Sequence, residues 1–136
     1  MTAVSPREYP GPSLRGTGPS LTPLDLAKRI ADLAQEKLAS DVVVLDMREA
    51  CSFTDYFVIA TGRNTRQTQA IAEEVREQVK AESRIVPRGL SGGREGTWIV
   101  ADYLDVVLHV FTSEAREFYG LEQLWGDVPA VELAAS

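Results

Sequence analysis

The sequence has little of the chemistry that catalytic and metal-binding sites need: among its 136 residues there is one cysteine, Cys51, and one histidine, His109. A single cysteine excludes an intrachain disulfide and a cysteine-rich zinc site. No apolar run approaches the ~18 residues that a membrane-spanning helix needs, and the N-terminus lacks the apolar stretch of a signal peptide. We therefore expect a cytoplasmic protein of a reducing compartment, with no membrane-bound part.

Basic charge is also scarce, with 14 lysines and arginines against 20 aspartates and glutamates and a formal net charge of −6. Proteins bind nucleic acid largely by neutralising its phosphates, which requires a basic surface. The acidic balance argues against a general DNA or RNA binder and favours a basic protein as partner. An RNA-contacting assembly factor remains an alternative, and it would require a local basic patch.

Phosphate-binding motifs are missing as well, since neither GxGxxG nor GxxxxGK(S/T) occurs in the sequence. The glycine-rich segment 92–96 lies between predicted strands, where no helix N-terminus follows to bind an anion, and we interpret it as a flexible connector. The segment 61–64 has a glycine but lacks the serine of a nucleotidyltransferase phosphate grip. Asp102 and Asp105, three positions apart, would face opposite sides of an extended strand, which disfavours shared magnesium binding.

One enzymatic alternative remains, a small nucleotidyltransferase-like protein that binds nucleotide and magnesium through Asp102, Asp105 and His109. A lone histidine in a strand is more often a hydrogen-bonded structural residue than a metal ligand. Strand alternation predicts that His109 shares a face with Val107 and Phe111. The hypothesis that we favour is a protein without catalytic activity, cofactor or bound metal.

Helical patterns with recognisable ends are present at three places. Thr22 predicts the cap of an amphipathic helix, and Asn64 with Gln67 resembles a capping pair for a second one. Ser113 is expected to cap a short last helix, which Gly120 ends.

Five short runs rich in β-branched and aromatic residues predict strands, at residues 41–46, 56–61, 85–90, 97–101 and 106–111. The third run contains Pro87 and is therefore predicted to lie at the edge of the sheet. The four-residue link between the last two runs predicts an antiparallel hairpin. These elements predict an α/β fold, one domain with a mixed five-stranded sheet flanked by helices.

The domain is expected to cover residues 21–126. Residues 1–20 contain four prolines and three glycines and few side chains that could form a core, so we expect a disordered tail there. Residues 127–136 are expected to form a C-terminal tail.

Aromatic and charged residues cluster late in the chain, including Trp98, Tyr119 and Trp125. Aromatic residues and arginine are favoured anchors of protein interfaces. We expect Trp125 in the core, whereas Trp98, beside a glycine loop at a strand start, is the better surface candidate.

An ordered series of segments resembles a known family. The segments are 41–46 (DVVVLD), 52–62 (SFTDYFVIATG), 98–103 (WIVADY), 105–111 (DVVLHVF), 116–119 (REFY) and 121–125 (LEQLW). In this order they resemble the ribosomal silencing factor family, also called Iojap-related, over about residues 24–125. The resemblance implies a nucleotidyltransferase-like fold without the active site, usually as a homodimer.

The resemblance also implies a function in translation regulation. Members of the family bind the large ribosomal subunit through ribosomal protein uL14, with at most minor rRNA contact, and sterically block association with the small subunit. This represses translation under starvation or in stationary phase. The contact surface maps here to Trp98, Tyr119, Leu121 and Glu122, with Asp102, His109 and Arg116 as neighbours. Arg116 and Glu122 are expected to pair with opposite charges on the basic ribosomal protein.

Three positions depart from the family pattern. Leu104 replaces a usual glycine, Asn64 a common serine and Ser91 a common acidic residue. We therefore expect the hairpin turn at Leu104 and the loop rim at Ser91 to differ from those of the family.

Overall fold

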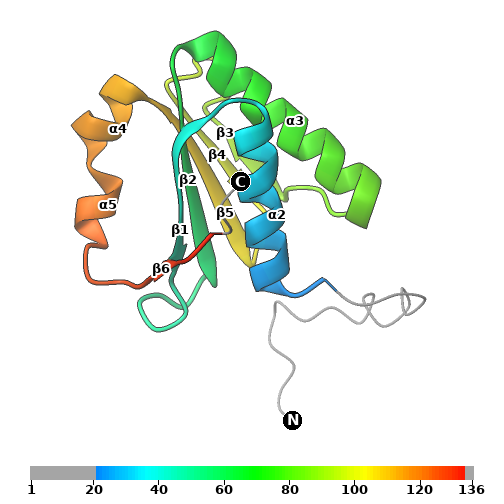
Figure 1. Cartoon of the computed structure of the whole chain (residues 1–136), viewed down its shortest axis with the longest axis vertical. Coiled ribbons are helices and arrows are strands. Elements are labelled where there is room, and N and C mark those ends of the chain that lie inside the picture. Colours follow the sequence, from blue (N-terminus) through cyan, green and yellow to red (C-terminus); the bar gives the residue numbers. More distant parts are fainter. Residues whose placement is uncertain (1–20, 134–136) are drawn as a thin grey trace.

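A computed structural model describes residues 21–133, and the predicted tail at 1–20 lies outside them. The elements are α2 (Pro23–Glu36), β1 (Ser40–Asp46), β2 (Tyr56–Gly62), α3 (Thr65–Ser83), β3 (Gly89–Ser91), β4 (Trp98–Asp102), β5 (Val106–Thr112), α4 (Ser113–Tyr119), α5 (Leu121–Leu124) and β6 (Ala130–Val131). They form one mixed sheet in the order β3-β4-β5-β2-β1-β6, with helices on both sides (Figure 1). The α/β fold class predicted from the sequence is confirmed.

The sheet has six strands, so the predicted number of five was wrong. The additional strand, β6, pairs antiparallel with β1 and lies within the segment expected to form a C-terminal tail. Two residues are too few to show the period of two by which a strand is recognised in a sequence. Asp46 also donates its backbone N–H to the carbonyl of Pro129 at 2.8 Å, which extends this pairing.

Parallel pairing occurs between β2 and β5 and places the ends of these strands side by side. All other neighbouring strands pair antiparallel. The β4–β5 hairpin confirms the prediction from the short link between these runs. The third predicted run was assigned too early and too long, because β3 spans only Gly89–Ser91, but it does lie at a sheet edge.

Helix ends follow the local sequence closely. The Thr22 hydroxyl accepts from the backbone N–H of Asp25 at 3.0 Å, and the Asn64 side chain accepts from that of Gln67 at 2.8 Å, so both predicted caps are confirmed. The predicted cap at Ser113 was wrong by one residue. The hydroxyl of Thr112 accepts from the N–H of Ala115, and Ser113 is already helical.

The two faces of the sheet are covered unequally. The long helices α2 and α3 pack on one face, and Val106, Leu108 and Val110 point towards them. The opposite face carries Val107, His109 and Phe111, as predicted from strand alternation, and is covered by the short helices α4 and α5. These helices have only seven and four residues, and on this face the side chains of Trp98 and Val100 in β4 are half-buried. None of the helices within residues 21–133 is long and apolar enough to cross a membrane.

Candidate functional site

Large apolar side chains are exposed on the two short helices. In α4, Phe118 is 80% exposed and Tyr119 is 53% exposed, and in α5, Leu124 is 73% exposed. The one residue that α4 buries is Ala115. Exposed apolar surface on a small protein commonly marks a binding site for another protein, so α4 and α5 form a candidate binding surface.

Three aromatic side chains meet at this place. The ring centroids of Trp98 and Tyr119 lie 4.7 Å apart, and those of Phe118 and Tyr119 lie 5.0 Å apart. We refer to Trp98, Phe118 and Tyr119 as the aromatic face. Trp98 begins β4 opposite Phe111 of β5, so the face lies at the carboxyl end of the parallel β2–β5 pair.

Trp98 is held in place by contacts from the sheet. Its ring stacks on that of Phe111 with centroids 4.9 Å apart, and its indole Nε1 donates a hydrogen bond to Nδ1 of His109 at 3.1 Å. The tryptophan is half-buried, so one part of the ring is fixed inside while another part reaches the surface. The prediction of Trp98 as a surface candidate is consistent with this position.

His109 itself lies inside the protein, with 6% of its surface exposed. The ring of Phe57 packs against it with centroids 4.7 Å apart. Burial disfavours the charged imidazolium and lowers the pKa of His109 to about 4, so the side chain is neutral at physiological pH. His109 therefore supports the aromatic face from below and lies too deep to contact a partner directly.

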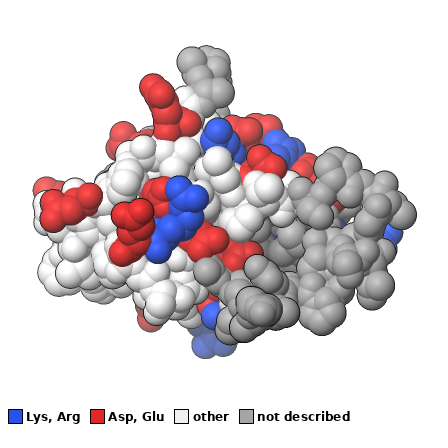
Figure 2. All heavy atoms as spheres, turned by 90° about the horizontal axis from the view of Figure 1, so that it is seen from below, with Lys and Arg blue, Asp and Glu red and all other residues white. Residues whose placement is uncertain are grey.

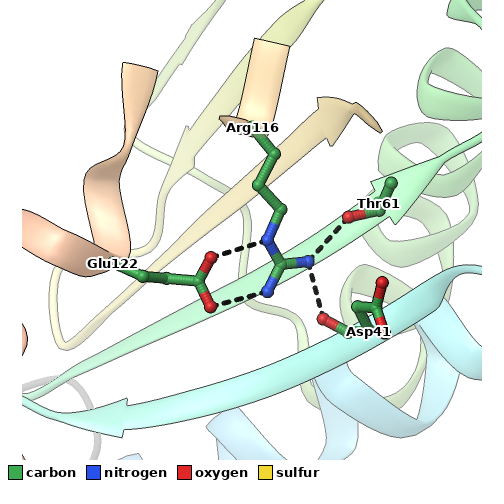
Figure 3. A network of polar contacts seen from close by, with 4 residues as sticks. All are labelled: Asp41, Thr61, Arg116 and Glu122. Atoms are coloured by element: carbon green, nitrogen blue, oxygen red, sulfur yellow. Dashed lines mark hydrogen bonds and ion pairs between the residues drawn. The ribbon is translucent and has the colours of Figure 1, made fainter. Parts of the chain in front are cut away.

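Arg116 and Glu122 pair with each other (Figure 3). The Arg116 Nε and Nη2 atoms donate to the two carboxylate oxygens of Glu122, each at 2.8 Å. Nη1 of the same guanidinium donates to the hydroxyl of Thr61 at 2.6 Å and to the backbone carbonyl of Asp41 at 2.7 Å. This network ties α4 and α5 to the ends of β1 and β2. The guanidinium also lowers the pKa of the Glu122 carboxyl.

Asp102 lies away from the aromatic face, although the family resemblance lists it as a neighbour. It ends β4 four positions after Trp98, so about 13 Å of strand separates the two Cα atoms. Its carboxylate accepts from the backbone N–H of Leu104 at 2.8 Å and from Nε of Arg88 at 3.1 Å. Asp102 thereby stabilises the β4–β5 turn, in which Leu104 adopts a left-handed conformation with φ 78°.

The loop before Trp98 is fastened to α3, which differs from the flexible connector that we expected. The Gln69 side chain donates to the backbone carbonyls of Gly93 and Arg94 at 2.9 and 3.0 Å. Gly92 has φ +79°, and a Cβ atom there would lie 2.0 Å from the carbonyl oxygen of Trp98. The glycine is needed for the loop to approach β4 this closely.

The segment that contains α4 and α5 is acidic. Residues 113–133 contain five acidic residues and one basic residue, Arg116, giving a net charge of −4. Because Arg116 is paired with Glu122, the remaining charges of this segment are acidic: Glu114, Glu117, Asp127 and Glu132. Figure 2, seen from below in the orientation of Figure 1, shows the end of the molecule opposite to α4, where acidic and basic groups lie side by side.

The three residues of the enzymatic alternative do not come together as a metal site. Within residues 21–133, no three histidine, cysteine, aspartate or glutamate side chains lie close enough to share a metal ion. A hollow of about 220 Å³ between α3 and β3, lined by Gln69, Glu73, Arg76 and Leu90 among others, is smaller than usual ligand pockets.

Sequence reasoning missed Phe118 and Leu124. A signal for Phe118 was present, because Phe118 and Tyr119 are adjacent in a short helix that packs one narrow stripe against the sheet. Two neighbouring aromatic residues cannot both lie in that stripe, so at least one had to be exposed.

Comparisons with known proteins converge on one family. A family model described as "Ribosomal silencing factor during starvation" matches residues 20–136. A Bacillus subtilis protein named ribosomal silencing factor RsfS is 39% identical over 108 residues, which cover 79% of this chain and 91% of the relative. A mouse protein named mitochondrial assembly of ribosomal large subunit protein 1 is 31% identical over 98 residues, covering 71% of this chain and 43% of the relative.

The fold is also similar to a solved structure. A crystal structure of a Chromobacterium violaceum protein superposes with a TM-score of 0.75 at 27% sequence identity, covering 85% of this chain and 94% of that protein.

Proposed function

The chain belongs to the ribosomal silencing factor family, and on that premise we propose that it binds the large ribosomal subunit through the aromatic face. We propose further that the partner is ribosomal protein uL14 and that binding blocks association with the small subunit without any catalysis. The observation that carries the proposal is the contact of half-buried Trp98 with exposed Tyr119. A large aromatic anchor that is fixed in the free protein loses little conformational freedom on binding.

Charge supports a basic protein as partner. The acidic residues of α4, Glu114 and Glu117, would attract a basic surface and repel phosphate. Ribosomal proteins carry basic surfaces because they contact ribosomal RNA. Exposed apolar side chains on an acidic helix therefore suit a ribosomal protein better than they suit RNA.

The proposal is tested by sedimentation of the purified protein with isolated large or small ribosomal subunits. We expect it to pellet with the large subunit alone. The combined W98A and Y119A substitutions should abolish this pelleting, because removal of each anchor costs about 2 kcal/mol or more. Pelleting of the double variant at the wild-type level would show that another surface makes the contact.

A matched control is available at Phe53, which is 55% exposed and so resembles Tyr119 in exposure. It precedes β2, whereas α4 follows the other ends of the parallel β2–β5 pair, about 20 Å away along the strands. Phe53→Ala should pellet with the large subunit as the wild type does.

A second candidate is a factor for assembly of the large subunit, favoured by the name of the mouse relative. This function would use the same partner and would add contacts to RNA. Binding that depends on phosphate contacts falls by about 10³ to 10⁵ between 50 and 200 mM salt, whereas a protein–protein contact responds far less. The affinity for the large subunit at these two salt concentrations distinguishes the two candidates.

A further inference from the structure

His109 combines two properties that are difficult to reconcile with a purely structural role. It is buried beneath the aromatic face, and its Nε2 atom has no hydrogen-bond partner within residues 21–133. Its Nδ1 atom accepts the hydrogen bond from the indole of Trp98. Since Nδ1 accepts, the neutral ring carries its proton on Nε2, and a buried N–H group is left unsatisfied.

A buried N–H group without an acceptor destabilises the folded protein. The neighbours of the ring include Phe57 and Phe111, so a phenylalanine in place of His109 would find an aromatic environment without that cost. What phenylalanine lacks is an acceptor for the indole N–H of Trp98. The acceptor is therefore the property of His109 that an apolar ring could not replace.

Contacts on three sides define the orientation of Trp98. Its ring stacks on Phe111 with an interplanar angle of 25°, and Tyr119 packs against it from α4. Stacking on Phe111 permits the indole to rotate or slide within its plane. The hydrogen bond to His109 removes that freedom, because it directs the Nε1 corner of the ring towards β5.

We propose that His109 is a positioning residue, whose Nδ1 atom holds the indole of Trp98 in the orientation that the binding partner recognises. The expected effect of His109 on binding rests on the proposed function, whereas the orientation of the Trp98 indole is a property of the free protein. Burial keeps His109 neutral at physiological pH, so the acceptor is available there. A role through Trp98 replaces the direct contact that the family resemblance suggested for His109.

The first arm of the test uses the free protein and the indole N–H resonances in ¹H–¹⁵N NMR. The chain has two tryptophans, so Trp125 provides an internal reference and Trp98→Phe assigns the signals. Replacing His109 by phenylalanine should shift the Trp98 indole resonance and accelerate its exchange with water, while that of Trp125 changes little. His109→Asn offers its Oδ1 atom near the position of Nδ1 and should restore part of the wild-type signal. An unchanged Trp98 resonance in His109→Phe would overturn the assignment.

The second arm measures affinity for the large subunit in a double-mutant cycle. His109→Phe should weaken binding about fivefold to tenfold, the equivalent of one hydrogen bond, with a melting temperature equal to or above that of the wild type. In a Trp98→Phe background the same substitution should have no further effect. An equal loss in both backgrounds would mean that His109 acts independently of Trp98 and would refute the proposal.

The two arms separate this inference from the proposed function. If the wild type fails to bind the large subunit while His109→Phe releases the indole, the proposed function is contradicted and the positioning of Trp98 stands. If the wild type binds and the cycle shows no coupling, the proposed function stands and the positioning role is rejected.

Discussion

Arg116 and Glu122 form a two-point ion pair that joins α4 to α5, with both nitrogen–oxygen distances at 2.8 Å (Figure 3). The same guanidinium reaches Thr61 and the carbonyl of Asp41, 55 and 75 positions earlier in the sequence. The pair therefore fixes α5 to α4, the helix that carries Phe118 and Tyr119, and the two charges satisfy each other.

Replacement of Arg116 by lysine tests the contribution of this hydrogen-bond network to stability. Lysine keeps the charge but cannot reach Glu122, Thr61 and Asp41 with one planar group. We expect the free energy of unfolding to fall by about 1–2 kcal/mol, a value reduced because Glu122 is partly exposed to solvent. Urea unfolding measures the change, with Arg76→Lys on the exposed face of α3 as control. Equal stability of R116K and the wild type would contradict the role assigned to the network.

Phe118 offers a test of the surface that leaves the fold intact. Because 80% of its side chain is exposed, Phe118→Ala should change the free energy of unfolding by less than about 0.5 kcal/mol. If the aromatic face binds the large subunit, the same substitution should weaken binding about tenfold. The melting temperature and the affinity for the large subunit, measured on Phe118→Ala and on the wild type, test both expectations. An unaltered affinity would place Phe118 outside the interface.

His109 predicts a specific dependence of stability on pH. Its pKa is lowered to about 4 in the folded protein, against about 6.5 in an unfolded chain. Between these values the unfolded chain binds a proton that the folded protein does not, so stability falls as the pH decreases from 6.5 to 4. The loss should reach about 3 kcal/mol at the lower limit and should be absent in His109→Phe. Urea unfolding of the wild type and His109→Phe from pH 7 to 4.5 measures this contribution. If the free energy of unfolding changed with pH in the same way in both proteins, the prediction would be refuted.

Alanine substitutions at the neighbouring residues Gly92 and Gly93 test the conformation of the loop before Trp98. A methyl group at Gly92 would collide with the carbonyl oxygen of Trp98 and would require an unfavourable positive φ, whereas one at Gly93 meets nothing within 4 Å. Gly92→Ala should lose about 2 kcal/mol or more of stability and should disturb the Trp98 indole resonance. Gly93→Ala should leave both unchanged. Similar behaviour of the two variants would mean that the loop is not fastened as described.

Local features of the fold could be predicted from the sequence because their causes are local. Thr22 and Asn64 cap helices through a backbone N–H three residues away. The alternation that sends His109 and Phe111 to the same face of β5 is likewise a property of consecutive residues. The main elements and the fold class follow from such patterns, whereas the two-residue strand β6 depends on its pairing with β1.

The sequence predicted which residues belong to the candidate site but not how their side chains contact one another. The hydrogen bond between Trp98 and His109 requires the register that pairs Trp98 with Phe111, and no local pattern specifies a register. The ion pair of Arg116 with Glu122 likewise depends on the turn between two helices. For this reason both His109 and Arg116 were expected to contact the partner, and their hydrogen bonds with Trp98 and Glu122 were not foreseen.

The proposed function requires the aromatic face to bind the large subunit and so to prevent subunit joining. Light scattering during mixing of large and small ribosomal subunits follows joining directly. We predict that the wild-type protein, added to large subunits first, suppresses the increase in scattering, and that the W98A and Y119A double variant does not. Normal joining in the presence of saturating wild-type protein, or equal suppression by the double variant, would contradict the account.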